Sequence, residues 1–138
     1  MNDIPEKIIT DEDAKPFEAQ STVFIFDNIK QAELCGDYST CVVGFVNPVQ
    51  VRNADNKLLG CANLELQGTN LVASFLLDPS TPERLDIETG SVKLYPFVNA
   101  QVNSIYEDHT TKFTKMLVEG LTLTPNKTLD DRIGAVNV

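Results

Sequence analysis

The sequence predicts an all-β domain, mainly antiparallel: a small sandwich or barrel of about seven or eight strands with an extended N-terminal arm. Short apolar segments whose side chains alternate with polar ones recur along the chain, and this period of two is typical of half-buried strands. Turn residues separate the segments at short intervals. Neither a nucleotide-binding glycine loop nor a regular alternation of strands with long helices is present.

Length and composition indicate one folded domain. The chain has 138 residues, of which 42% are hydrophobic and 22% charged, the balance of an ordinary globular protein. We divide it into an acidic extended arm (residues 1–20), a β domain (21–126) and a polar C-terminal tail (127–138). The N-terminus lacks the basic and apolar regions of a signal peptide, and no apolar run is long enough to span a bilayer. We therefore expect a cytoplasmic protein.

The arm allows two interpretations. It carries more acidic than basic side chains, and Pro5 and Pro16 discourage a continuous helix. A frayed terminus is the simpler interpretation. However, spaced apolar side chains are unusual in a solvated tail, so our second hypothesis is that the arm lies along a neighbouring subunit or donates a strand to it. The candidate interaction residues are Ile4, Ile8, Ile9 and Phe17.

The first strands are expected between residues 21 and 52. Ser21 to Asp27 is dense in β-branched and aromatic residues and predicts the first strand. A short helix is expected over 29–34, closed by Gly36. The next strand is Thr40 to Val46, which Asn47-Pro48 breaks or bulges before the chain continues extended from Val49 to Arg52.

A central hairpin is the most regular pattern of the sequence. After a turn at 53–56, alternation from Leu58 predicts a strand with Ala62, Leu64 and Leu66 on the core face. Gly68 lies in the turn at 67–70, and the return strand, 71–77, is apolar on both faces. We therefore expect this return strand to be central in the sheet and covered on both sides.

Prolines interrupt the sheet after the hairpin. Asp78 to Pro82 ends the strand, because proline lacks an N–H group and restricts the residue before it. Residues 82–85 are either one helical turn with Thr81 as its N-cap or a crossing loop. Alternation over Ser91 to Val98 predicts another strand, with Pro96 making its end an edge or a bulge.

The C-terminal third is less regular. A strand is expected near 100–105, followed by a polar loop at 107–111. Residues 113–124 fit either a helix or a strand; we favour a strand for Met116 to Thr124, because Gly120 would weaken a helix. In the tail, the side chains that we expect to dock weakly on a neighbouring surface are Ile133, Val136 and Val138.

Catalytic chemistry has little support in the sequence. His109 is the only imidazole, and a dyad with Cys35 or Cys41 is the only arrangement that presents itself. No signature of a hydrolase surrounds either cysteine, so we expect no enzyme. Cys35, Cys41 and Cys61 are odd in number, which leaves at least one of them unpaired, and the absence of C-x-x-C spacing disfavours zinc.

Charge restricts the partners. The net charge is −9, and such a surface repels nucleic acid and anionic membranes. The acidic groups at 11–13 and 130–131 do not follow a calcium-loop pattern, so we expect neither a metal site nor a cofactor. What remains as a partner is a protein, a neutral small ligand or a cation, and we expect a protein together with self-association of the chain. The alternative is a ligand-binding module that uses the loops at 78–90 and 106–112.

Three segments within residues 58–98 carry a resemblance to a known group: GCANLEL, LVASFLLDPSTPERLDIETG and VKLYPFV. Together they resemble small structural proteins of tailed-phage virions. Such proteins, among them capsid decoration and cement proteins, are non-enzymatic β modules that oligomerise and clamp neighbouring capsomers. The resemblance implies a virion protein assembled in the host cytoplasm, and it assigns no individual residue a role.

Overall fold

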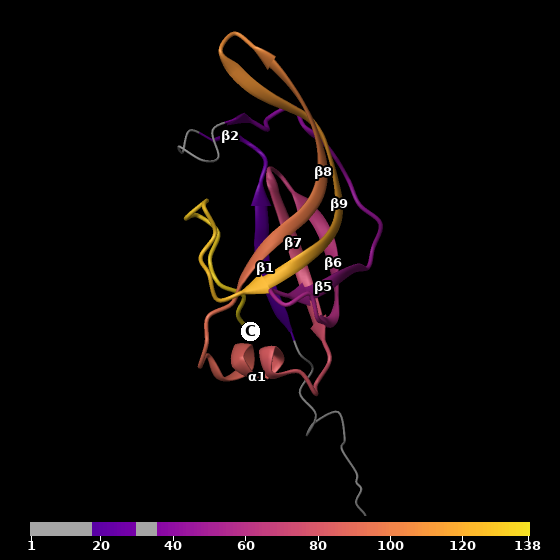
Figure 1. The fold of residues 1–138 in the computed structure, drawn as a ribbon, viewed down its shortest axis with the longest axis vertical. Helices are drawn as coiled ribbons and strands as arrows, with labels where there is room; N and C mark the ends of the chain where they lie inside the picture. The colour runs from indigo at the N-terminus through magenta and orange to yellow at the C-terminus, as the bar shows by residue number, and fades with distance from the viewer. Residues whose placement is uncertain (1–17, 30–35) are drawn as a thin grey trace, which may run out of the picture.

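The computed structural model describes residues 18–29 and 36–138, and in them it has nine strands and one helix. All nine strands belong to one sheet that curls into a half-barrel (Figure 1). The predicted all-β, mainly antiparallel class is confirmed. The elements are β1 (Ala19–Ile25), β2 (Asn28–Ile29), β3 (Gly36–Asp37), β4 (Val42–Gly44), β5 (Val49–Asn53), β6 (Leu58–Gln67), β7 (Asn70–Leu77), α1 (Pro82–Thr89), β8 (Tyr95–Glu107) and β9 (Thr110–Thr124).

Strand β9 organises the sheet. The strand order is β1-β7-β6-β5-β9-β3-β2, with β4 and β8 also paired to β9. β3, β4 and β5 follow one another along β9 in parallel orientation, whereas β8 pairs with it antiparallel over its whole length. Consequently β1 and β8 are edge strands of the described sheet.

The predicted central hairpin is confirmed as β6–β7, and β7 lies between β1 and β6. Gly68 has a φ of 64° in the connecting turn, a conformation that glycine adopts without strain. The expected cover on both faces of β7 is wrong for the described residues: Phe75 is 3% exposed, whereas Leu76 is 62% exposed. Leu66, expected in the core, is 43% exposed at the hairpin end. An apolar outer face on a strand does not ensure that another part of the chain packs against it.

Strand β6 contains a bulge that requires a glycine. Val51 pairs with Gly60 and Arg52 with Leu58, which leaves Leu59 as the additional residue. Gly60 has a φ of 154°, and a Cβ at this position would lie 2.3 Å from the carbonyl oxygen of Leu76. The close approach of β6 to β7 therefore excludes a side chain here.

The predicted strand over 91–98 begins later and extends further than expected. Residues 91–94 are irregular, and β8 runs from Tyr95 to Glu107. Pro96 does not end the strand but is its second residue and is buried. An edge strand tolerates proline because one of its sides needs no ladder donors.

The segment after Thr81 is a helix, not a crossing loop. α1 has Pro82 at its first position and ends at Gly90, which has a φ of 70° and donates its N–H to the carbonyl of Asp86. The hydroxyl of Thr81 bonds the carbonyl of Asp78 and does not cap the helix. Ile87, 4% exposed, holds the helix against the end of the sheet.

The ambiguous segment 113–124 is a strand, as preferred, but its alternation changes phase. Asn99 pairs with Gly120 and Ala100 with Val118, so Glu119 is an additional residue in β9. Val118 and Leu121 both face the core despite their odd spacing, whereas Leu117 is 40% exposed. The bulge restores core-facing side chains on both of its sides.

The N-terminal half matches the predictions in part. β1 lies close to the predicted strand, and the strand expected over 40–46 is reduced to β4. The helix expected over 29–34 falls mostly outside the described residues, and its first residue lies in β2. The Asn47 side chain bonds the backbone of Leu64 through both its amide and its oxygen, at 2.9 and 2.8 Å, and this mimics a strand pair.

The C-terminal segment, residues 127–138, packs on its own domain. Ile133 and Val136 are 3% and 4% exposed, whereas Val138 is 61% exposed. The Val136 N–H bonds the Leu94 carbonyl at 2.8 Å. Arg132 connects the segment to the end of β1, because its guanidinium bonds Asp27 with both terminal nitrogens.

We expect Gly60→Ala to lower the free energy of unfolding by about 2 kcal/mol or more, because the new Cβ meets backbone atoms at a strained φ. Urea unfolding measures the loss. Gly68→Ala is the control: its φ is also positive, but a Cβ there has open space, so about 1 kcal/mol is expected. Equal losses in the two variants would contradict this account of the bulge.

The second prediction concerns acid stability. Hydrogen bonds from Arg132 hold the pKa of Asp130, a buried carboxyl, below its ordinary value. A lowered pKa in the folded state contributes stability above the ordinary carboxyl range, and this contribution is lost as the pH falls. Arg132→Gln should therefore destabilise the protein at pH 7, and the difference from wild type should shrink below about pH 4.

Thermal unfolding as a function of pH checks this. Arg52→Gln is the matched control, since Arg52 bonds the neutral groups of Gln50 and Asn56. A gap between wild type and Arg132→Gln that stays constant down to acid pH would disprove the role of this pair.

Candidate protein-interaction site

The distal half of the β8–β9 hairpin, residues 101–117, is here called the hairpin arm. Figure 1 shows that the hairpin extends past the other strands, at the end of the molecule opposite α1. Every β8 residue from 101 to 107 is exposed. At the tip, Asp108 and His109 have φ values of 53° and 63°, as in the type I′ turns that match the twist of antiparallel strands.

One face of the arm continues the core-facing side of the sheet. Cross-strand partners share a face, and the core pair Ala100–Val118 is followed by a row that we call the inner row: Val102, Ser104 and Tyr106. Their partners on β9 are Met116, Phe113 and Thr111 respectively. Val102 is 43% and Tyr106 71% exposed, so the apolar lining of the domain continues into solvent.

Aromatic rings hold the middle of the arm. Phe113 stacks on Tyr38 with ring centroids 4.2 Å apart and planes 7° from parallel. Phe24 meets the Tyr38 ring edge-on at 4.9 Å. Gly36 lies under the Phe113 ring, where a Cβ would come within 2.3 Å of it. The arm is therefore connected to the core through packed rings, and rings in these geometries stabilise beyond their buried area.

The β8 strand of the arm carries little charge. Ile105 is 49% exposed, and the ion pair between Lys112 and Glu107 spans the strands near the tip at 2.9 Å. This contact raises the pKa of Lys112. Between Lys93 and Glu107 the sequence has no charged side chain. An exposed, uncharged strand with an apolar row is typical of a protein-binding surface, where charged residues are depleted and tyrosine is enriched.

The structure describes only some of the residues that were proposed from the sequence. Ile4, Ile8, Ile9 and Phe17 lie outside the described residues, as does Cys35. His109 is in the turn of the arm. Cys41 and Cys61 are free and half-buried.

The described residues around Cys41 do not activate its thiol. Burial raises the pKa of this thiol, the opposite of what a nucleophile requires. Burial, and secondarily Cys41, raise the pKa of Tyr38, so the phenol also stays protonated.

The two loops of the alternative ligand site do not come together. Residues 78–90 include α1, and residues 106–112 form the arm tip; Figure 1 places them at opposite ends of the molecule. Charged side chains of the first loop contact other parts of the same chain: Arg84 pairs with Glu88 at 3.5 Å and donates a hydrogen bond to the Leu77 carbonyl. Within residues 18–29 and 36–138, no three His, Cys, Asp or Glu side chains are grouped as metal ligands.

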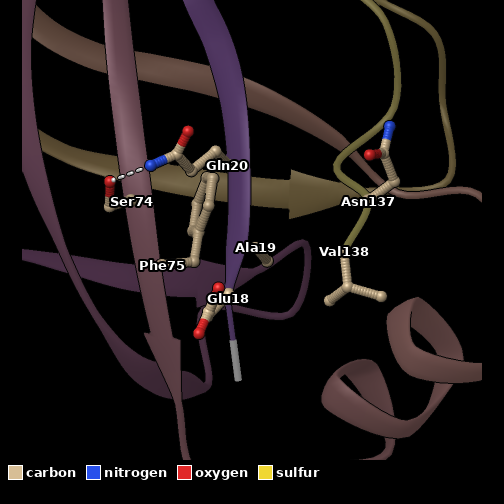
Figure 2. A pocket seen from close by; sticks show the side chains of 7 residues that line it. All are labelled: Glu18, Ala19, Gln20, Ser74, Phe75, Asn137 and Val138. Atoms are coloured by element: carbon tan, nitrogen blue, oxygen red, sulfur yellow. Dashed lines mark hydrogen bonds between the residues drawn. The ribbon is translucent and has the colours of Figure 1, made fainter. Parts of the chain in front are cut away.

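Two of the hollows on the described surface border β1. Figure 2 shows the larger of these two, an open space of about 560 Å³ where the start of β1 meets the C-terminal residues. Gln20 and its β7 neighbour Ser74 point toward one another and form a hydrogen bond of 3.2 Å, and Glu18 is the one charged side chain among the described lining residues.

The smaller hollow, about 210 Å³, lies between Phe24 of β1 and Phe97 of β8 and is bounded by the C-terminal segment. It is apolar but smaller than the roughly 300 to 1,000 Å³ of ordinary ligand pockets. Neither hollow gathers groups that could perform chemistry.

Comparisons with protein-family models, curated proteins and solved structures find no match to this chain. In the part of the chain that the structure describes, no helix has the length and apolar character needed to cross a membrane. The arm therefore stands as the candidate site on geometry alone.

Sequence reasoning missed the arm, although the sequence contained a signal. It identified a strand near 100–105 and a polar loop after it, without joining them to the strand at 116–124. The available indication of one long hairpin was that an uncharged extended segment ends at Glu107 and a second segment rich in β-branched and apolar residues begins at Thr110. Asp108-His109 is a weak turn signal compared with Asn-Gly.

We expect Phe113→Ala to loosen the arm more than the body. Loss of a half-buried ring should lower the unfolding free energy by about 2 kcal/mol. Amide hydrogen exchange should accelerate over 101–113 while β6 and β7 keep their relative protection. Uniformly faster exchange over all strands would show that the rings stabilise the whole domain and not the arm in particular.

Proposed function

We propose that this protein is a non-enzymatic structural protein that attaches to a larger protein assembly, with the hairpin arm as its contact. The observation that carries the proposal is the inner row. Val102 and Tyr106 continue the core face of the sheet beyond the body and remain 43% and 71% exposed. Phe113, which lies on the same face opposite Ser104 and stacks on Tyr38, supports their orientation.

The energetics favour a protein partner. Burial of apolar surface contributes about 25 cal/mol per Å², and a tyrosine on a rigid strand loses little conformational entropy on binding. Interface energy is concentrated in such anchors. The uncharged edge of β8 also offers backbone groups for strand addition.

The narrower form of the proposal is a phage capsid accessory protein of the decoration or cement kind, acting as an oligomer in the virion. This form is supported by the resemblance of residues 58–98 to such proteins. A rigid β body with a protruding hairpin is compatible with clamping a neighbouring subunit, and the charge of −9 does not favour direct contact with packaged nucleic acid.

The test is co-sedimentation of the purified chain with large assemblies from its native source. The double variant Val102→Ser/Tyr106→Ser should weaken binding at least about tenfold, or 1.4 kcal/mol, with its thermal midpoint close to that of wild type. Leu85→Ser is the matched control, since Leu85 is 59% exposed on α1, at the opposite end. Equal co-sedimentation of wild type and the double variant would refute the role of the arm.

A further inference from the structure

We propose that the free edge of β8 over residues 101–107 pairs with the same edge of a second copy, antiparallel, about a two-fold axis that passes by Ser104. The inference deepens the proposed function and rests on it: within the assembly, the arm joins this chain to a further copy of itself. The two arms would form one four-stranded sheet in the order β9-β8-β8-β9.

The edge of β8 is available for pairing. Among the described residues its one ladder partner is β9. The lower part of β8, at Pro96 to Val98, faces β1 and the C-terminal segment, whereas the upper part stands clear of the body (Figure 1). A free edge presents a row of unpaired N–H and C=O groups that another strand can bond.

This edge lacks the features that usually prevent pairing. Natural edges are blocked by lysine, proline, inward charges or bulges. Residues 101–106 contain neither a proline nor a charged side chain. Both bulges of the hairpin, at Glu119 and Thr114, lie in β9, so the backbone of β8 keeps a regular spacing of donors and acceptors.

The sequence of this edge is compatible with self-pairing. A two-fold interface requires that each residue fits the residue it meets on the other copy. About Ser104, the apolar Val102 meets Tyr106, Gln101 meets Glu107, and Asn103 meets Ile105 on the outer face. Each pair is separated by an even number of residues, which keeps both inner rows on the same face of the joint sheet.

Charge favours a second copy at this edge over other surfaces of the chain. Two bodies of charge −9 repel each other, but no like charges meet in the pairing: Glu107 faces the amide of Gln101. Antiparallel arms also place the two bodies at opposite ends of the joint, which keeps the repelling charges apart. The remaining repulsion is long-range, so salt should strengthen the association.

The arrangement also buries apolar side chains that are exposed in the monomer. Val102 and Tyr106 become cross-strand neighbours twice, once on each side of the axis, and apolar cross-strand pairs of this kind stabilise a sheet. The short paired region predicts a reversible, concentration-dependent dimer.

The experiment uses the position on the axis. Sedimentation velocity of the full chain across a wide concentration range should show a monomer–dimer equilibrium. Ser104→Lys and Ser104→Asp each place like charges opposite one another, so each should raise the dissociation constant at least about tenfold. An equimolar mixture of the two variants should restore the dimer, because Lys then meets Asp.

Asn63→Lys and Asn63→Asp are the matched controls, on an exposed position of β6, and they should leave the equilibrium unchanged. Far-ultraviolet circular dichroism confirms that all variants fold. A strictly monomeric wild type, a dimer unaffected by Ser104→Lys, or a mixture that stays monomeric would each overturn the proposal.

Different results would disprove the self-pairing of the arm and the proposed function. If wild type is monomeric but Ser104→Lys loses co-sedimentation with the native assembly, self-pairing is wrong and the arm binds a different protein. If wild type is monomeric and co-sedimentation is also unchanged in both the Ser104 and the Val102/Tyr106 variants, the proposed function fails as well.

Discussion

The pairing of β9 with four other strands is the constraint on which the remaining structure depends. β3, β4 and β5 occupy one side of β9 in succession, and β8 occupies the other. The bulge at Glu119 is what permits this: without the additional residue, Leu121 and Val118 would face opposite sides of the sheet. Because the sheet curls around this strand, its inner face becomes the core, and β1 and β8 are among the edge strands.

The arm follows from the same pairing. Only β8 accompanies β9 to its beginning near the tip, since β3 meets it at Lys112 and β4 from Lys115 onward. A two-stranded ribbon alone has marginal stability in water, which explains why Phe113 and Tyr38 stack at the middle of the arm and why Gly36 leaves room for the ring. Support there gives the exposed inner row a defined orientation, which a binding surface requires.

The two ends of the half-barrel's opening differ in whether other residues cover them. Between α1 and the end of β1, the C-terminal segment lies against β1 and β8, with Ile133 and Val136 buried and Arg132 bonded to both Asp27 and Asp130. At the other end, nothing in the described chain covers the edge of β8. Among the described residues, the C-terminal segment thus covers part of the core, whereas the edge of β8 on the arm stays uncovered.

The sequence by itself determined the β class, the central hairpin and the strand at 116–124, because these depend on local alternation and on turn residues whose backbone preferences are intrinsic. It could not determine which strands pair with β9, that Leu76 stays exposed, or that the tail packs on its own domain. Those features depend on contacts between residues far apart in the chain. The candidate site belongs to this second group: the residues assigned from sequence lie in the first 17 positions, whereas Val102, Ser104 and Tyr106 acquire their significance only from the register of β8 on β9. Bulges decide that register, and a bulge changes which side chains face solvent without leaving a clear mark on the hydrophobic pattern.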